Sequence, residues 1–224
     1  MDKTRLAKKD GAVPAETLLA TLNLLREVFS DELITVRDRI CSMTYYGAHE
    51  LARSFRTVRG NTITIAEEIP EEHYGFRPAA GCRSIAETLA HIAIMPRVPA
   101  KIHVTDHVDT LVNFNFFEVM GQLQAELQVP RTKAQILELL RTEGETYSTI
   151  LSGASEEFLA EQVTFPEGME PRVKSRIEML MSAKEHEMHH RAQLMVSQRL
   201  LGIVPHQTRQ MEERMAQMRA ATNA

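Results

Sequence analysis

Apolar side chains recur every three or four positions through several long stretches of the chain, which is the spacing of an amphipathic helix. One such stretch runs from Pro14 to Ile40, and another runs from Gly47 to Glu68 and stops before Pro70. No run of alternating apolar and polar residues is long enough for a sheet, and no internal repeat is visible. The pattern therefore predicts an all-α protein.

Capping signals mark where later helices begin. Ser84 is followed three residues later by Glu87, and Thr132 is followed in the same way by Gln135. In such a capping box the hydroxyl accepts a hydrogen bond from a free backbone N–H, and the longer side chain bonds back to the capping residue. The sequence thus predicts helices that start at these two positions, and Ser155 is expected to cap one shorter turn.

The longest predicted helix extends from Ser175 to Leu201 and contains neither glycine nor proline. Gly202 and Pro205 follow it as stop signals. The preceding segment QVTFPEGMEP is predicted to be a linker, and residues 103–129 are too irregular to assign to one element. Four helices between residues 47 and 201 are most economically arranged as a four-helix bundle.

The predicted bundle occupies residues 43–205. Residues 1–42 form an added N-terminal helical extension, which is expected to lie outside any site in the bundle core. Residues 206–224 form a C-terminal helical tail in which Met211, Met215 and Met218 recur at helical spacing. These methionines are expected to pack in the core or against a second subunit.

Composition and charge narrow the functional classes. The 224-residue chain is 43% hydrophobic and 25% charged, as in an ordinary globular protein, and its net charge of −4 gives no support for nucleic-acid binding. No apolar segment is long enough to span a bilayer, and no export signal follows the basic N-terminus. Cys41 and Cys82 form no paired motif, which fits a reducing compartment. We therefore expect a cytoplasmic protein whose partner is a small molecule.

Three histidines are candidates for metal ligands. His186 and His190 are four residues apart in the longest predicted helix, so both imidazoles lie on one helical face at a spacing that a metal ion can bridge. A single histidine is more often a core or surface residue, but this pair stands among apolar positions, where an unpaired ring would need a partner. His91 lies in another predicted core helix and is the natural third ligand.

The same residues contain a competing motif. His186 and Glu187 begin the string HEMHH, which matches the HExxH pattern of metalloproteases, with Glu187 as the base that activates water. The match is short. Gln193 and Val196 stand where the longer metzincin pattern needs glycine and histidine, and no strand is predicted that could bind a peptide. A metallohydrolase is therefore the weaker interpretation.

The segments AEEIPEEHYGFRPAAGCRSIAETLAHIA and HEMHHRAQLMVSQRLLGIVP resemble the two signature regions of the DinB-like (YfiT-like) superfamily of metal-binding four-helix-bundle proteins. The resemblance covers about residues 46–205, and Ala192 departs from it where glycine is common. It implies metal ligation by His91, His186 and His190, a divalent ion such as zinc or nickel, and frequent homodimers. In characterised branches it also implies transferases or isomerases that use a low-molecular-weight thiol.

Other residues near the motif have alternative explanations. Glu87 could orient an imidazole, although its capping role already accounts for it. Arg191 and Gln193 could contact a substrate carboxylate, although a solvated arginine is an equally good explanation. His189 is expected on the surface, since it is turned away from its ligand neighbour. No residue is identified as catalytic.

Two classes of function stay open at this point. The first is an enzyme in which the ion deprotonates a thiol cosubstrate, and the three protein ligands favour it because they leave coordination positions free. The second is a non-catalytic metal-bound module with a regulatory or stress-associated role, which the lack of an evident acid or base favours.

Overall fold

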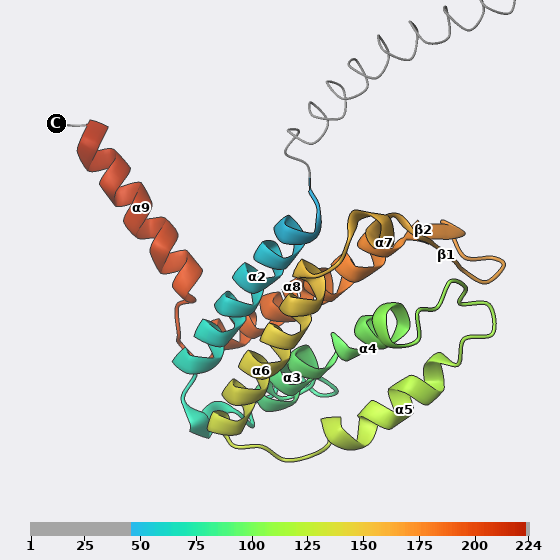
Figure 1. The fold of residues 1–224 in the computed structure, drawn as a ribbon. Helices are drawn as coiled ribbons and strands as arrows, with labels where there is room; N and C mark the ends of the chain where they lie inside the picture. Colours follow the sequence, from blue (N-terminus) through green and yellow to red (C-terminus); the bar gives the residue numbers. More distant parts are fainter. Residues whose placement is uncertain (1–45, 223–224) are drawn as a thin grey trace, which may run out of the picture. The chain divides into compact units, whose positions relative to one another are not determined.

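The computed structural model describes residues 46–222, so the predicted helix from Pro14 to Ile40 lies outside the described residues. Within the described part the predicted all-α class is confirmed, and four helices form a bundle (Figure 1). Helices α2 and α3 each pack against both α6 and α8. The bundle helices are α2 (Ala48–Glu68), α3 (Ile85–Ile94), α6 (Lys133–Ser152) and α8 (Arg176–Leu200).

The capping boxes begin their helices where the sequence predicts. The Ser84 hydroxyl accepts a hydrogen bond from the Glu87 backbone N–H at 3.2 Å, and the Glu87 carboxylate accepts one from the Ser84 N–H at 2.8 Å. Thr132 and Gln135 make the equivalent pair of contacts at the start of α6. Each box satisfies backbone groups that a helix start would otherwise leave free, which sets the first residue of the helix.

Two clusters of buried side chains fill the bundle. Most members are aliphatic, and burying one such side chain contributes about 1.5–3 kcal/mol to stability. In the second cluster the rings of Phe55 and Tyr147 meet edge to face, with centroids 5.0 Å apart. The first cluster includes Ile65, Ile69, Tyr74, Ile85, Leu89, Ile92, Leu140 and Leu194, and the second includes Leu51, Phe55, Tyr147, Leu151, Leu159 and Leu180.

The segments between the bundle helices contain more structure than the sequence predicts. The predicted linker holds two antiparallel strands, β1 (Gln162–Thr164) and β2 (Val173–Ser175), so the expectation of no strand is wrong. Each strand has three residues, too few to show an alternating pattern. The short turn capped by Ser155 is α7 (Glu156–Ala160), and the unassigned region contains α5 (Phe116–Leu127). A short 3₁₀ turn, η1 (Glu71–His73), follows α2.

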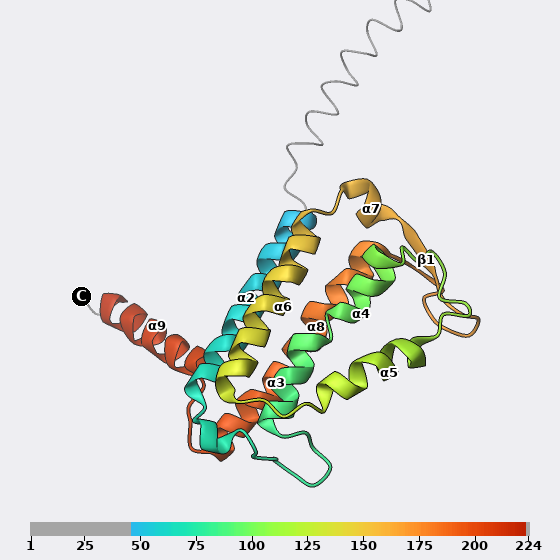
Figure 2. The same ribbon diagram turned by 60° about the horizontal axis from the view of Figure 1, so that its bottom comes forward.

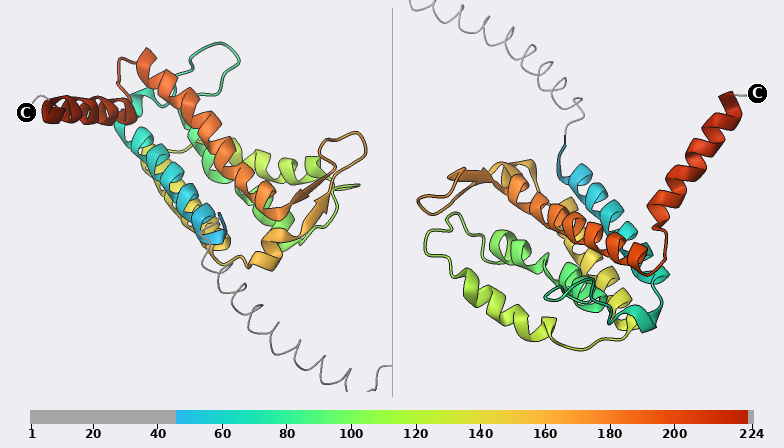
Figure 3. Two further views of the ribbon diagram at one scale, coloured as in Figure 1. Left: turned by 90° about the horizontal axis from the view of Figure 1, so that it is seen from above. Right: turned by 180° about the vertical axis from the view of Figure 1, so that it is seen from behind.

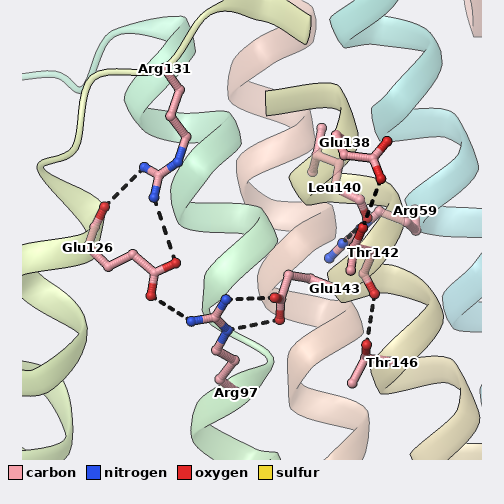
Figure 4. Close-up of polar contacts among 9 residues, drawn as sticks. All are labelled: Arg59, Arg97, Glu126, Arg131, Glu138, Leu140, Thr142, Glu143 and Thr146. Carbon is pink, nitrogen blue, oxygen red and sulfur yellow. Dashed lines mark hydrogen bonds and ion pairs between the residues drawn. The ribbon is translucent and has the colours of Figure 1, made fainter. Parts of the chain in front are cut away.

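Helix α3 is extended beyond Pro96 by α4 (Arg97–Ala100) and by a π-helical turn, η2 (Lys101–Thr105). Arg97 ties this extension to its neighbours (Figure 4). Its guanidinium donates to both oxygens of Glu143 on α6, at 2.9 and 2.6 Å, and to Glu126 on α5 at 2.6 Å. Arg131 donates to the Glu126 backbone carbonyl at 3.0 Å. The pair between Arg97 and Glu126 joins α5 to the extension of α3, and α5 packs beside α3 (Figure 2).

The last helix, α9 (His206–Thr222), extends beyond the bundle (Figure 3). Gly202 ends α8 with φ of +78°, a left-handed conformation that suits glycine, and His206 is the one residue of α9 that is buried. Met211, Met215 and Met218 are exposed, so of the two expected roles, core packing is wrong within the described structure, and packing against a second subunit stays a prediction. Among the described residues, no helix combines the length and apolarity needed to cross a membrane.

One buried arginine contacts all four bundle helices. Arg59 of α2 is 4% exposed and donates to the carboxylate of Glu187 on α8 at 2.9–3.1 Å. It also donates to the backbone carbonyls of Leu140 on α6, at 2.8 Å (Figure 4), and Ile92 on α3, at 3.2 Å. Gly144 of α6 makes room for this side chain, because a Cβ there would lie 2.8 Å from Cγ of Arg59.

Two glycine substitutions test this packing. Gly60→Ala faces open space in α2 and is expected to stabilise the protein by about 0.5–1 kcal/mol through helix propensity. Gly144→Ala has the same propensity gain but forces the pinned Arg59 side chain to move, which costs about 1–3 kcal/mol. Denaturant unfolding should therefore show a higher free energy of unfolding for Gly60→Ala than for the unsubstituted protein. For Gly144→Ala the free energy of unfolding should be lower than for the unsubstituted protein, or at least clearly lower than for Gly60→Ala. Equal stabilisation by both would show that Arg59 is not held in place.

Candidate metal centre

Two helices supply the three candidate histidines. His91 lies in α3, which its capping box starts at Ile85, and His186 and His190 lie one turn apart on α8. His91 and His190 are 6% and 7% exposed, and His186 is half-buried. The fold thus brings His91 next to His186 and His190, which follow it by 95 and 99 positions in the sequence.

The spacing of the ring nitrogens suits a single ion. Nε2 of His186 lies 3.1 Å from Nε2 of His91 and 3.1 Å from Nε2 of His190, and the possible ligand atoms of all three lie within 4.8 Å of one another. With zinc–nitrogen distances of about 2.0–2.1 Å and tetrahedral angles, two ligating nitrogens would be about 3.4 Å apart. The donor set therefore fits a tetrahedral ion with small adjustments of the rings.

The surroundings keep these rings neutral. Burial lowers the pKa of His91 from 6.5 to about 3, with a further contribution from the positive charge of Arg83. Burial also lowers the pKa of His186 to about 4, and that of His190 in the same direction. Three neutral imidazoles with Nε2 atoms facing one another are the form that a divalent ion needs, because a protonated ring has no free lone pair.

Gln193 fixes the orientation of His190. Its side-chain oxygen lies 2.8 Å from Nδ1 of His190, and since this oxygen can only accept, Nδ1 carries the proton and Nε2 is left free toward the triad. The amide nitrogen of Gln193 lies 3.1 Å from Nε2 of the exposed His189. Gln193 therefore contacts a candidate ligand directly. Nδ1 of His91 is buried and has no hydrogen-bond partner among the described residues.

Glu187 occupies a different place from the one that the HExxH pattern requires. Both of its carboxylate oxygens accept hydrogen bonds from Arg59, and its side chain is 1% exposed in the bundle interior. The glutamate of a metalloprotease HExxH helix stands at the same helical position, so the pairing with Arg59, and not the helical spacing, distinguishes Glu187. The geometry does not fit a base that activates water at the triad, and it assigns Glu187 to a structural ion pair.

The other two candidates also lie apart from the triad. The Glu87 carboxylate caps α3 and pairs with Arg77 at 2.7 and 2.5 Å, which lowers the pKa of Glu87. Arg191 follows His190 on α8 but lines neither of the two cavities that other residues of α8 line. The structure gives Glu87 a capping role, and a substrate contact by Arg191 stays a prediction.

A cavity of about 640 Å³ opens beside His190. Its lining includes several polar side chains that the sequence did not single out, and Arg83 is the one with a permanent charge. Arg83 directly precedes Ser84, the N-cap of α3. The fold of the loop before α3 places Arg83 at the same cavity as residues of α8. The lining residues are Pro78, Gly81, Cys82, Arg83, Ile85, Thr88, His189, His190, Gln193, Leu194 and Ser197.

Comparison with known proteins agrees with this fold. The model of the DinB family matches residues 41–220. The chain belongs to the DinB family. YjoA, an uncharacterized protein of Bacillus subtilis, is 27% identical over 155 residues, which cover 69% of this chain and 91% of YjoA.

Two solved structures share the fold of this DinB-family protein. A putative DinB-family member from Exiguobacterium sibiricum has a TM-score of 0.50 and 23% identity, over 72% of this chain and 95% of that one. YfiT from Bacillus subtilis has a TM-score of 0.55 and 13% identity, over 72% and 91% of the two chains. YfiT is described as a probable metal-dependent hydrolase with an unusual four-helix bundle topology. The four-helix arrangement predicted from the sequence is thus confirmed.

The lowered pKa values predict how pH affects the metal-free protein. His91 and His186 stay unprotonated in the fold down to about pH 4, whereas the unfolded chain takes up protons near pH 6.5. The unfolded state therefore binds more protons in this window, and the free energy of unfolding should fall as pH drops from about 6.5 to about 4.5. His103, whose pKa burial lowers to about 4, contributes with the same sign.

The measurement is the free energy of unfolding of chelator-treated protein, obtained from denaturant titrations at several pH values in this range. His186→Asn should show a shallower dependence than the unsubstituted protein, because one of the contributing rings is gone. A free energy of unfolding that stays constant over the range would contradict the neutral, buried state of the triad.

Proposed function

We propose that this DinB-family protein is a metal-dependent enzyme that binds one divalent ion through His91, His186 and His190 and transfers a low-molecular-weight thiol to an electrophile. The observation that supports it most directly is the position of the triad, three neutral imidazoles beside a cavity with a polar, positively charged wall. Three protein ligands leave at least one coordination position free, as in catalytic sites. Imidazole ligands suit zinc or nickel.

When bound, such an ion supplies positive charge that lowers the pKa of a thiol, so that the sulfur is a nucleophile near neutral pH. The protein supplies position and environment. Gln193 holds the His190 ring, burial keeps the imidazoles uncharged, and Arg83 adds a positive charge to the cavity. The thiol proton leaves to solvent, the sulfur forms a bond to the electrophilic carbon, and the leaving group departs with the electron pair of its broken bond.

A metal-dependent hydrolase is the second candidate, and the description of YfiT is one reason to consider it. Water activation needs a base near the ion, and the arrangement of Glu187 and Arg59 excludes Glu187 from that role. His189 lines the cavity and is the side chain placed to accept a proton there. A peptide hydrolase of the HExxH type has no support in this geometry.

Metal analysis tests the ligand set. The purified protein is expected to hold about one divalent ion per chain, and His91→Ala, His186→Ala or His190→Ala should each weaken binding by more than about a hundredfold. Gln193→Leu, which removes only the partner of His190, should weaken it by about tenfold to a hundredfold. His189→Ala is the matched control and should keep the ion. Full metal content in His186→Ala with loss in His189→Ala would overturn the assignment.

Activity assays distinguish the candidate functions. The metal-loaded protein should consume a chromogenic electrophile only when a thiol is supplied, tested with glutathione-like, bacillithiol-like and mycothiol-like compounds, and His186→Ala should abolish this activity. Cleavage of a chromogenic ester without thiol would favour the hydrolase, and cleavage of unfolded casein would favour a protease. Failure in all three assays would support a non-catalytic metal-bound module.

Glu187→Gln is not a clean probe of mechanism in these assays. From the sequence alone, the substitution is expected to cost little in thiol transfer, because the ion rather than Glu187 removes the thiol proton; the ion pair with Arg59 adds an effect on stability. The change removes the negative charge that compensates buried Arg59, and breaking a buried ion pair costs about 3–5 kcal/mol. Loss of activity in that variant has to be separated from loss of folded protein by measuring both.

A further inference from the structure

A second cavity of about 420 Å³ lies at the other end of α8 from the first. Its walls are almost entirely apolar, with three phenylalanines and two methionines. The π-helical turn η2 contributes Ile102 and His103, and such turns recur at functional sites. The lining residues are Val98, Pro99, Ile102, His103, Leu111, Phe114, Phe116, Phe165, Pro166, Met169, Met179 and Ser182.

This second cavity carries no net charge. His103 is 1% exposed, and burial lowers its pKa to about 4, so its ring is neutral. Nδ1 of His103 lies 3.2 Å from the Arg176 guanidinium, which is itself 1% exposed and paired with the carboxylate of Glu161 at 2.7 Å. The positive charge in contact with His103 is therefore compensated, and the walls favour an apolar group.

The two cavities and the triad share one face of α8. At about 100° per residue, positions 179, 182, 186, 190, 193 and 197 fall within about 60° of one line along the helix. Met179 and Ser182 line the apolar cavity, and Gln193 and Ser197 line the polar one. His186 and His190 lie between these two pairs. The order along the helix is thus apolar cavity, triad, polar cavity.

The facing wall repeats this order. Helices α3 and α4 pack against α8 (Figure 2). Along α3, α4 and η2, Thr88 lines the polar cavity, His91 belongs to the triad, and Val98 and Ile102 line the apolar cavity. The rise of about 1.5 Å per residue puts Met179 only about 10 Å along α8 from His186. A small molecule anchored at the triad therefore has an apolar surface within reach on one side and a polar one on the other.

The polar side offers a cation. Arg83 makes no ion pair with any described residue, whereas Arg77 in the same loop is paired with Glu87. The hydroxyl groups of Thr88 and Ser197 donate to backbone carbonyls within their own helices, which leaves their oxygens able to accept but adds no negative charge. An anionic group in this cavity would have the Arg83 guanidinium as its partner.

We propose that the two cavities continue past the triad as one groove between α3–α4 and α8, and that this groove takes a substrate pair with unlike ends. An anionic group contacts Arg83, an apolar group fills the cavity around Met179, and the reacting atoms meet at the triad. This inference rests on the proposed function and specifies its substrates. The thiol carries a carboxylate or another anion, and the electrophile carries an alkyl or aromatic group. Arg83 and Met179 are then specificity-determining residues.

Metal-anchored probes test the two ends without any reaction. Hydroxamates chelate the ion, so their tails report on the groove alone. Zinc-loaded protein is titrated by calorimetry with acetohydroxamate as the reference, with succinic acid monohydroxamate for an anionic tail, and with hexanohydroxamate for an apolar tail. The anionic tail is expected to improve affinity by roughly threefold to tenfold. The apolar tail should improve it by at least about tenfold, since one fully buried methylene is worth about fourfold.

The variants should separate the two gains. Arg83→Gln is expected to remove the gain of the anionic tail alone, and Met179→Gln, a change of similar side-chain length, should reduce the gain of the apolar tail alone. Arg191→Gln and Met188→Gln are matched controls, because they remove a guanidinium and a thioether from positions on α8 that line neither cavity. Both should leave the affinities of all three hydroxamates unchanged. Phe165→Ser is a second variant at the apolar end, and zinc content and thermal unfolding of each variant confirm that it is folded.

Affinities that do not depend on the tail, or variants that weaken both tails equally, would overturn the proposal. Failure of all three hydroxamates to bind the zinc-loaded protein would overturn it too, because the groove would then not be accessible from the triad. Thiol-dependent consumption of an electrophile is measured separately. The groove proposal and the proposed function can therefore fail independently.

Discussion

The contacts of Arg59 hold the four bundle helices in one arrangement. A buried guanidinium loses its hydration, and it is tolerated only where acceptors replace the lost water. Glu187 supplies the compensating charge, and the carbonyls of Leu140 and Ile92 satisfy further donors. The net contribution of such a pair to stability is small, but any arrangement that separates its members leaves a buried charge without a partner. The contacts therefore select one packing of α2, α3, α6 and α8.

This constraint reaches the candidate metal site through α8. With Glu187 directed to Arg59, the helix cannot rotate about its axis, and the neighbouring face that carries His186 and His190 is held toward His91. Gln193 then fixes the His190 ring within that face. A glutamate that would serve as a base in a metalloprotease here orients the helix instead. The sequence HEMHH therefore matches the metalloprotease pattern, but its glutamate, Glu187, has a structural role here.

The surroundings of the triad explain why a small and chemically mixed substrate suits it. The rings are buried enough to stay neutral, yet His190 borders a cavity with a polar wall, and the same helical face leads to a second cavity with aromatic and methionine walls. Methionine side chains are flexible and adapt to irregular apolar groups. The extension of α3 beyond Pro96, held by Arg97 against α5 and α6, supplies part of the wall of this apolar cavity.

Local patterns in the sequence determined the helix starts at Ser84 and Thr132, the end of α8 at Gly202 and the shared face of His186 and His190, because these depend on residues within one or two turns of each other. The all-α class followed from the same short-range periodicity. The partner of Glu187, the need for Gly144 and the place of Arg83 at the cavity depend on side chains that are distant in sequence; Arg59 and Glu187, for example, are 128 positions apart. The three-residue strands β1 and β2 pair across a loop and carry too little pattern of their own. Only the tertiary structure decides such contacts, because burial and charge compensation arise between helices and not within them.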